Sequence, residues 1–271
     1  MIKRLYPGGK AKAFNTSYDD GVLQDLRFVQ MLNRYGLKGT FNLNSALMQQ
    51  EFEWVHESGM TVKRLSADAA RKLYQGHEVA SHTSTHPYMH DLTEAQILSE
   101  MWSDRYHLEK LLGQEVSGFA VPFTYYSPLI AACAENVGFE YARISEETNC
   151  YIPPEDYYWW RGGKFHWDGD LDDYVEGFLA TDEELALCQI VGHSYDLDVM
   201  RMWDKMERIF EKIQNAADVL PMTNIELVRY LKAMRKTVIT GSTLRNTSSV
   251  DLWFEIDGKI TVVHPGEEIL Y

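Results

Sequence analysis

The sequence predicts an α/β fold: a parallel sheet or barrel of βα units, followed by a small β appendage. Strand-like and helix-like patterns alternate with a period of roughly 30 to 40 residues, which is typical of βα units. From about Lys236 the pattern changes to short alternating runs, with Asp257-Gly258 as the clearest hairpin signal. We therefore expect a main α/β domain over residues 1–235 and an appendage over residues 236–271. The length of 271 residues suits one large core, although size alone also allows two smaller domains.

Each predicted strand is a short apolar or alternating run that ends at glycine or polar residues. The first of them ends at Asp19-Asp20-Gly21, and the most apolar one ends at His193. In a parallel sheet or barrel, the chemistry is expected at these carboxyl ends. The predicted strands cover residues 11–18, 37–44, 77–82, 116–122, 138–144 and 186–194.

The predicted helices follow from apolar residues at helical spacing and from capping residues. Ser66 and Thr93 are suitable N-caps, and Gly36 and Gly76 are suitable stops. The aromatic segment 151–169 is predicted to be a long loop, and long loops in compact domains are often functional. The predicted helices cover residues 22–35, 66–74, 93–113, 129–136 and 201–217.

The amino-acid composition limits the classes of molecule that the protein can be expected to bind. With 26 basic and 40 acidic residues, the formal charge of -14 argues against nucleic acid or an anionic membrane as a partner, and a neutral or cationic substrate fits better. No transmembrane or secretory segment is evident. Three widely spaced cysteines without a CxxC pair predict no disulfide framework, so we expect a cytoplasmic protein, with export left open if a leader precedes this chain.

His82 and His86 are the first metal-ligand candidates. On an extended strand they would lie about 13 Å apart, too far for two ligands of one metal. They can converge only if the chain turns helical after the preceding strand, because the i,i+4 spacing then puts them on one face. Two solvent-exposed histidines at a turn are the equally favoured alternative.

Asp19-Asp20 supports the metal hypothesis. Neighbouring carboxylates at a strand end repel each other, so in a cleft they need a cation or a shared proton. Their side chains point in different directions, so Asp20 can bind a metal while Asp19 accepts a proton from water. By itself Asp-Asp-Gly is more often a surface turn. A single histidine such as His193 would more often be a buried core residue. Here it is the third candidate at the end of a predicted strand, so it could face the other two across a barrel mouth.

Four motifs together resemble those of the polysaccharide deacetylases, the NodB-homology or carbohydrate esterase 4 family. SYDDG at 17–21 resembles the family's T-F-D-D-G, and HTSTH at 82–86 matches its H-[ST]-x-x-H. FAVPF at 119–123 is similar to its F-R-x-P-Y, and VGHS at 191–194 is similar to its L-x-H. The first two motifs are specific and the last two are weak, and the resemblance covers roughly residues 10–235.

This resemblance implies a distorted (β/α) barrel of the NodB-homology type that removes N- or O-acetyl groups from carbohydrates. It implies that Asp20, His82 and His86 bind a divalent metal ion, with zinc the first choice. Asp19 would be the general base and His193 the general acid. The metal and a backbone N–H near Phe123 would stabilise the oxyanion.

The third motif departs from the family. Ala120 stands where the family has an arginine that orients the catalytic aspartate, and Phe123 replaces its tyrosine. Arg143 and Arg161 are the candidates to supply the missing contact; both could equally be surface residues. If neither does, the base is less well held and the activity differs.

Substrate contacts are expected from aromatic and charged residues near the motifs. The loop at 157–167 is rich in aromatic rings, which either stack on sugars or fill the barrel mouth. The predicted substrate-binding residues are Tyr18, Phe123, Trp160, Arg161, His166 and Tyr195.

Two other functions stay open at this point. The same motifs can hydrolyse a non-sugar amide or cyclic imide, which the altered third motif would favour. A catalytically degenerate carbohydrate-binding protein is the non-enzymatic alternative. The partner is then a carbohydrate or a small amide, and a homo-oligomer formed through the appendage is also open.

Overall fold

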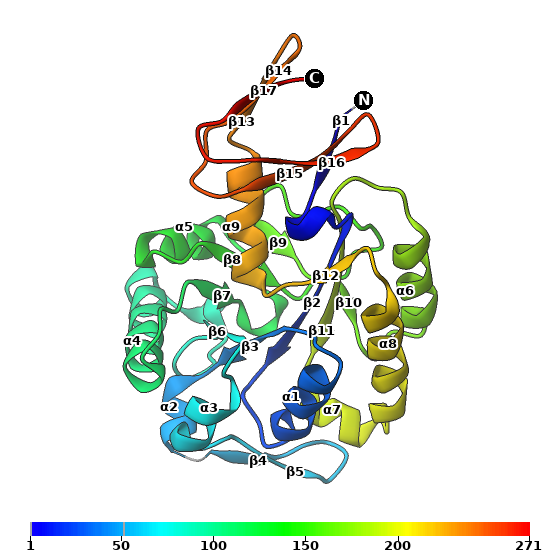
Figure 1. Ribbon diagram of the computed structural model, residues 1–271. Helices are drawn as coiled ribbons and strands as arrows, with labels where there is room; N and C mark the ends of the chain where they lie inside the picture. The colour runs from blue at the N-terminus through cyan, green and yellow to red at the C-terminus, as the bar shows by residue number, and fades with distance from the viewer. Residues whose placement is uncertain (1, 51) are drawn as a thin grey trace.

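The computed structural model describes residues 2–50 and 52–271, and its centre is a sheet of eight parallel strands curled into a half-barrel (Figure 1). The edge strands β9 and β10 pair with one neighbour each, so the barrel wall is open between them. A further strand, β12 (Val219–Pro221), pairs with the first half of β2. This architecture confirms the predicted distorted (β/α) barrel. In spatial order the strands are β10 (Lys164–Phe165), β11 (Ala186–Gly192), β2 (Lys12–Asp19), β3 (Gly39–Leu43), β6 (Glu78–Ser81), β7 (Gly118–Ala120), β8 (Tyr141–Ile144) and β9 (Trp160–Arg161).

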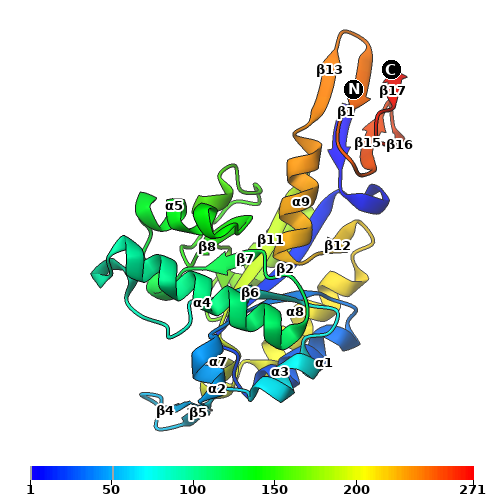
Figure 2. The same cartoon turned by 90° about the vertical axis from the view of Figure 1, so that its left-hand side faces the viewer.

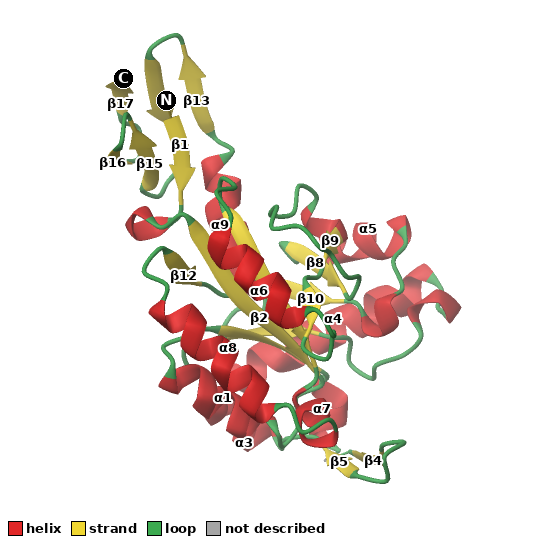
Figure 3. Cartoon of the chain, turned by 90° about the vertical axis from the view of Figure 1, so that its right-hand side faces the viewer, coloured by secondary structure: helices red, strands yellow, loops and turns green. Residues whose placement is uncertain are grey.

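Helices cover the outside of the half-barrel, as the red helices around the yellow strands in Figure 3 show. The predicted caps are present: the Ser66 side chain accepts a hydrogen bond from Ala69 N, and Thr93 with Gln96 forms a capping box. The helices are α1 (Asp25–Arg34), α2 (Ser45–Gln49), α3 (Ala67–Leu73), α4 (Glu94–Leu112), α5 (Pro128–Val137), α6 (Leu171–Ala180), α7 (Ser194–Val199), α8 (Trp203–Asn215) and α9 (Asn224–Met234).

The structure corrects the prediction in two segments. The expected loop 151–169 contains β9 and β10. Between the predicted strand 37–44 and the predicted helix 66–74, where no element was predicted, lie α2 and a hairpin of β4 (Glu53–Val55) and β5 (Thr61–Lys63). These strands have two or three residues each, too few to display an alternating pattern. The sequence patterns also did not identify α6, α7 and α9.

The barrel interior beside β2 is polar, and Asp19 belongs to the row of β2 side chains that face it. On β2, Asn15 and Ser17 face inward, where Asn15 donates to Asn224 and Ser17 accepts from Asn42, both at 2.9 Å. The alternate residues, including Tyr18, face the helices, and the Tyr18 ring stacks on Phe28 of α1. Because side chains alternate along a strand, Asp19 is the last inward residue of this row.

The appendage forms two three-stranded sheets, β1-β15-β16 and β13-β14-β17. Asp257 and Gly258 have φ of 48° and 79°, which confirms the predicted hairpin turn. The strand β1 (Ile2–Leu5) comes from the N-terminus, so the predicted boundary between 235 and 236 does not separate all of this unit from the rest. The remaining strands are β13 (Thr237–Thr240), β14 (Thr243–Asn246), β15 (Leu252–Ile256), β16 (Lys259–Val263) and β17 (Glu268–Leu270).

The appendage and the β4–β5 hairpin lie at opposite ends of the barrel (Figures 1 and 2). Both chain termini lie at the appendage end, and the strands of the barrel end at the hairpin side. Among the described helices, none has the length and apolar character required to cross a bilayer.

Candidate metal centre and catalytic site

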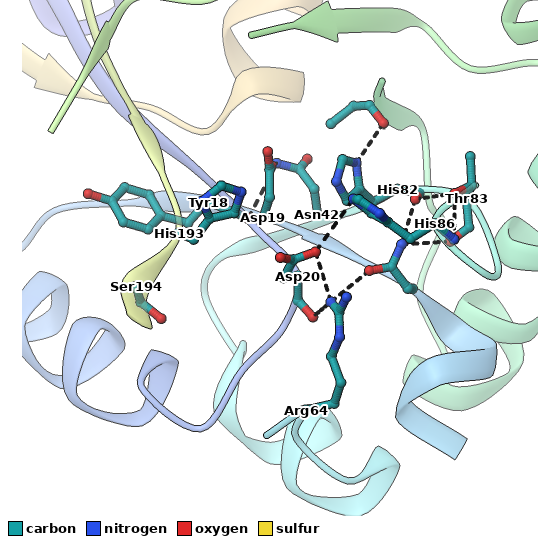
Figure 4. Close-up of polar contacts among 12 residues, drawn as sticks. Tyr18, Asp19, Asp20, Asn42, Arg64, His82, Thr83, His86, His193 and Ser194 are labelled. Carbon is teal, nitrogen blue, oxygen red and sulfur yellow. Dashed lines mark hydrogen bonds and ion pairs between the residues drawn. The ribbon is translucent and has the colours of Figure 1, made fainter. Parts of the chain in front are cut away.

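The ends of three neighbouring or nearby strands bring the predicted residues to one place. Asp19 ends β2 and Asp20 follows it, His82 follows β6, and His193 follows β11. Figure 4 shows Asp20 between Arg64 and the two imidazoles, with Asp19 and His193 beside them. The parallel sheet therefore unites residues that are up to 174 positions apart in the sequence, 19 to 193.

Asp20, His82 and His86 have the geometry of an open metal site. Their ligand atoms lie within 4.8 Å of one another, and Asp20 Oδ1 is 3.8 Å from His86 Nε2. Ligands of tetrahedral zinc lie about 3.4 Å apart for bonds of about 2.1 Å, so small side-chain rotations would close the site. Two imidazoles and one carboxylate are a donor set that zinc accepts, with a fourth position left for water or substrate.

The histidines present neutral nitrogen atoms to this site. His82 Nδ1 lies 2.8 Å from the carbonyl oxygen of Ala120, which requires a proton on Nδ1 and leaves the Nε2 lone pair free. Burial lowers the pKa of His82, and burial together with His82 lowers the pKa of His86 to about 4. Both rings are thus unprotonated at neutral pH, as metal binding requires.

The loop between the two histidines does not turn helical, and the predicted helical turn is wrong. Thr83 and His86 have φ of 65° and 56°, and these two left-handed residues reverse the chain so that the rings lie 4.8 Å apart. The Thr83 hydroxyl accepts a hydrogen bond from His86 N at 3.1 Å and holds the reversal. Non-glycine residues in this region cost about 1–3 kcal/mol each, so the loop stores strain beside the site.

Asp104 of α4 fixes the start of this loop. Its buried carboxylate accepts hydrogen bonds from Ser81 Oγ at 2.6 Å and His82 N at 3.2 Å, and from Ser45 N at 2.7 Å. Burial raises the pKa of Asp104 to about 6. A residue on the helix layer thus positions the backbone of a candidate ligand.

Arg64 contacts the candidate ligand Asp20, and sequence reasoning did not identify it. Its guanidinium lies 2.9 Å from Asp20 Oδ1 and also contacts the Asp20 carbonyl oxygen. The same nitrogen donates to Asn44 Oδ1 at 2.7 Å, and the Asn44 amide donates to the carbonyl oxygens of His82 and Thr83. Arg64 thereby links both ligand-bearing loops. No motif marks this residue, because its position depends on how the β4–β5 hairpin folds back.

Arg64 also determines the charge of Asp20. Burial disfavours the ionised carboxyl, but Arg64, His193 and His86 outweigh burial and lower the pKa of Asp20 well below its ordinary value. Asp20 is therefore a carboxylate across the neutral pH range. Its φ of 87° is a third strained non-glycine conformation at the site.

Arg143 is the arginine that contacts Asp19. It is fully buried, and its guanidinium hydrogen-bonds to Asp19 Oδ1, while Asn42 donates to the same oxygen at 2.6 Å. Arg143 pairs in register with Ala120 on the adjacent strand, so the arginine missing from the third motif is supplied from one strand further along. The other candidate, Arg161, pairs instead with exposed Glu146 at 2.7 Å.

The surroundings of Asp19 keep it ionised. Burial raises its pKa, but the charge of Arg143, followed by His82 and His193, prevails, and the pKa of Asp19 is lowered. An ionised carboxylate can accept a proton.

His193 is held in the protonated form by its neighbours. Its Nδ1 lies 3.0 Å from Asp196 Oδ2, and its ring stacks between Trp167 and Tyr195. Burial would lower the pKa of His193, but Asp196, Asp20 and Asp19 raise it to about 9. A cation held by Asp20, His82 and His86 would weaken this effect, because it offsets the negative charge of Asp20 and of the neighbouring Asp19.

The six predicted substrate-binding residues separate into three groups. Phe123 and Tyr195 lie at the mouth: Phe123 is 46% exposed with its ring 4.5 Å from His86, and the Tyr195 ring stacks on His193 at 5.0 Å. Tyr18 and His166 have no exposed surface and bond to each other at 3.0 Å. Neither side chain therefore has exposed surface on which a substrate could lie.

Trp160 and Arg161 line a cavity of about 610 Å³ at the open edge of the barrel, away from the candidate metal centre. Trp160 is 2% exposed and packs on Tyr141. The residues that line this cavity do not include Asp19, Asp20 or the three site histidines. The structure therefore does not bring Trp160 and Arg161 to the candidate metal centre.

The half-barrel places one carboxylate and two imidazoles that could hold a metal ion at the carboxyl ends of its strands. The polysaccharide deacetylase family model matches residues 8–142, which include the strands of Asp19, Asp20 and His82. The chain belongs to the polysaccharide deacetylase family, and its fold is of the NodB type. No curated protein matches the chain.

Solved structures agree on the fold at low sequence identity. A proposed polysaccharide deacetylase from Mycobacterium smegmatis has a TM-score of 0.62 at 13% identity, covering 88% of this chain and 97% of that one. A family 4 acetyl xylan esterase from Clostridium thermocellum, in complex with a cobalt ion, has a TM-score of 0.53 at 17% identity, covering 81% and 91%. A mutant of BA3943, a family 4 pseudoenzyme with restored activity, has a TM-score of 0.55 at 15% identity, covering 83% and 70%. Because a pseudoenzyme shares this fold, activity must be argued from the site.

Proposed function

We propose that this protein is a metal-dependent hydrolase that removes acetyl groups from an N- or O-acetylated carbohydrate. The observation that carries the proposal is the convergence of Asp20, His82 and His86 within 4.8 Å, directly beside an ionised Asp19. A divalent ion held by these three residues would polarise the acyl oxygen and make water more acidic.

Asp19 is the proposed general base. Arg143 and Asn42 both donate hydrogen bonds to its Oδ1, which restrains the orientation of the carboxylate. In its ionised form, Asp19 accepts the proton that water loses when it attacks the acetyl carbon. Asp20 is not the proposed base, because its carboxylate pairs with Arg64 and belongs to the group that would hold the metal.

His193 is the proposed general acid. Its Nδ1 is engaged with Asp196, which leaves Nε2 to donate a proton to the departing amine or alcohol. The contact with Asp196 raises the pKa of His193 and favours the protonated ring, also where a bound cation offsets the charge of Asp20 and Asp19. Opposite proton states of Asp19 and His193 are what acid–base cleavage of an amide or ester requires.

A carbohydrate substrate is supported by the family and by the charge of the chain. The esterase from Clostridium thermocellum is by name an acetyl xylan esterase, and its structure contains cobalt. A net charge of -14 favours a neutral or cationic sugar over an anionic one. The altered third motif was one of the grounds for both earlier alternatives, a non-sugar amidase and a degenerate binding protein. Arg143 supplies the contact to Asp19 that this motif lacks, which weakens that ground.

Acetate release tests the proposal. Purified protein loaded with Zn²⁺ or Co²⁺ is incubated with N-acetylglucosamine oligomers, acetylated xylan and a panel of cyclic amides. We expect acetate from at least one of the sugars, loss of release with a chelator and its return with the metal. Hydrolysis of cyclic amides alone, or sugar binding without any acetate, would contradict it.

A further inference from the structure

A buried carboxyl group that the proposed mechanism does not use lies close to the candidate catalytic site. Asp25 is the first residue of α1, five positions after Asp20, and it has no exposed surface. Its Oδ1 accepts a hydrogen bond from Ser194 Oγ at 2.5 Å, and its Oδ2 accepts one from the Tyr74 hydroxyl at 2.6 Å. One carboxyl group therefore joins three segments that are distant in the sequence.

The contact between Asp25 and Ser194 joins the two loops that carry the proposed base and acid. The parallel pairing of β2 with β11 ends one residue before Asp19 on one strand and one residue before His193 on the other. Ser194 follows His193 directly and is the first residue of α7, and Figure 4 shows it beside His193, on the side away from the two ligand imidazoles. The hydrogen bond to Asp25 therefore fixes the chain immediately after His193 relative to the loop that follows β2.

The contact with Tyr74 anchors Asp25 to the packed interior. Tyr74 is the C-cap of α3 and is 2% exposed, and its ring packs on Phe41 of β3 at 4.5 Å between ring centroids. With one oxygen held by Tyr74, the carboxyl group presents its other oxygen to Ser194 at a set position. Asp25 is thus a bridge between the helix layer and the loop of His193.

Burial makes this carboxyl group costly for the stability of the fold. It raises the pKa of Asp25 to about 7, although the hydrogen bonds from Ser194 and Tyr74 act in the opposite direction. Replacing buried charged groups by apolar side chains of similar volume is often neutral or even stabilising. What a carboxyl group provides at this position is therefore geometry, because its two oxygens accept from hydroxyls on two different segments at once.

We propose that Asp25 is a positioning residue, which holds the His193 loop at the spacing from the Asp19 loop that the proposed acid and base require. This inference rests on the proposed deacetylase function. In this role Asp25 does not touch the substrate and acts through Ser194. A displacement of about 1 Å between reacting groups can cost about 10²-fold in rate, so a small shift of the His193 loop should be visible in kcat.

Glu78 offers a matched control at the amino end of β6. It too is a buried carboxyl group that accepts hydrogen bonds from two hydroxyls, those of Thr40 at 2.9 Å and Tyr141 at 2.7 Å. It begins its strand, whereas the candidate site lies at the carboxyl ends of the strands. Asp25→Ala and Glu78→Ala should therefore both lower the stability of the fold, but only Asp25→Ala should lower kcat.

Steady-state acetate release by the zinc-loaded proteins, at a temperature where all of them are folded, tests the inference. We expect Asp25→Ala and Ser194→Ala each to lower kcat about 10- to 100-fold, with KM and zinc content nearly unchanged. The double variant should be no slower than the slower single variant, because both substitutions remove the same interaction. Asp25→Asn should keep most of the activity, since an amide can accept from one hydroxyl and donate to the other. An equal loss of kcat in Glu78→Ala, or losses that multiply in the double variant, would overturn the inference.

Hydrogen exchange distinguishes failure of this inference from failure of the proposed function. In Asp25→Ala and Ser194→Ala, the amides of residues 191–197 should exchange about ten-fold faster than in the native protein, whereas in Glu78→Ala they should not. Ser194→Ala is the smaller change and keeps both measurements available if Asp25→Ala does not fold. If the native protein releases no acetate, the proposed function is removed, and exchange alone decides whether Asp25 holds the His193 loop. Unchanged exchange over residues 191–197 would overturn the inference even where acetate release is normal.

Discussion

Asp19 and Asp20 are adjacent in the sequence, yet two different parts of the molecule hold them. Asp19 is held by the barrel wall: Arg143 comes from β8 and Asn42 from β3, and both are buried strand residues. Asp20 is held by loops, because Arg64 comes from the β4–β5 hairpin region and its partner Asn44 reaches the loop of His82.

The two regions also differ in backbone strain. Asp20, Thr83 and His86 adopt left-handed conformations, whereas Asp19, Asn42 and Arg143 lie in regular strands. The proposed base is thus built into the wall of regular strands, whereas the proposed metal ligands depend on strained loops and on one arginine. The two regions should therefore respond differently to mutation.

The largest expected effect is a loss of activity, and it distinguishes the proposed metal ligand His82 from the proposed base Asp19. His82→Ala should lower acetate release by about 10³-fold or more, because a metal supplies several kcal/mol of transition-state stabilisation. Asp19→Asn should lower kcat by about 10²–10⁴-fold while the metal stays bound. Kinetics and metal titration on the same samples check this. Loss of metal from Asp19→Asn would contradict the separate roles of Asp19 and the proposed metal ligands.

A somewhat smaller effect is expected for Arg143→Ala, which tests how the strands of the barrel hold Asp19. Arg143→Ala leaves the carboxylate of Asp19 buried without its cation, which should destabilise the fold by about 3–5 kcal/mol and raise the pKa of Asp19. The acidic limb of the pH–rate profile should then move to higher pH. Chemical denaturation and the pH profile measure the two consequences.

Two variants control this experiment. Arg34→Ala removes a surface arginine paired with Glu207 and should change neither property. Ala120→Arg in the Arg143→Ala background returns the arginine to the adjacent position in register and should restore part of the activity. No recovery, with the fold intact, would argue against a positioning role for Arg143.

Arg64→Gln tests the loop region. Loss of the contacts to Asp20 and Asn44 should weaken Zn²⁺ binding about ten-fold, as is usual when a partner of a metal ligand is removed. Calorimetry in competition with a chelator measures this. Tighter binding would mean that the positive charge of Arg64 opposes the metal more than its contacts support Asp20.

The smallest expected effect is a pH dependence of stability. The folded-state pKa of His193 is raised from 6.5 to about 9, so its stabilising contribution is fully present below about pH 6.5 and is lost as pH rises through about 9. The Tm of the metal-free protein should fall across this window. Asp196→Asn should flatten the fall; an unchanged slope would contradict the assigned cause.

Much of the barrel wall could be predicted from the sequence. The alternation of β2, the apolar run of β11 and the spacing of the motifs identified the strands and the residues at their ends. Arg143 could be named as a candidate, although the sequence did not favour it over Arg161. The same alternation that turns Asp19 inward turns Tyr18 outward, so applying the two-residue period to Tyr18 would have corrected its expected role.

The loop region could be predicted only in part. His82 and His86 were identified by their motif, but their convergence through left-handed Thr83 and His86 has no sequence signal, since glycine is the residue that normally marks such positions. Arg64 and the short hairpin strands before it depend on tertiary contacts. The fold was thus more predictable than the support of the metal ligands.

Metal content tests the central claim most directly. The native protein, Asp20→Ala and Asp19→Asn are each dialysed against Zn²⁺ and then against metal-free buffer, and bound zinc is measured by elemental analysis. The account predicts one ion per chain in the native protein and in Asp19→Asn, and none in Asp20→Ala. Zinc retained by Asp20→Ala at the native level, or absent from the native protein, would contradict it.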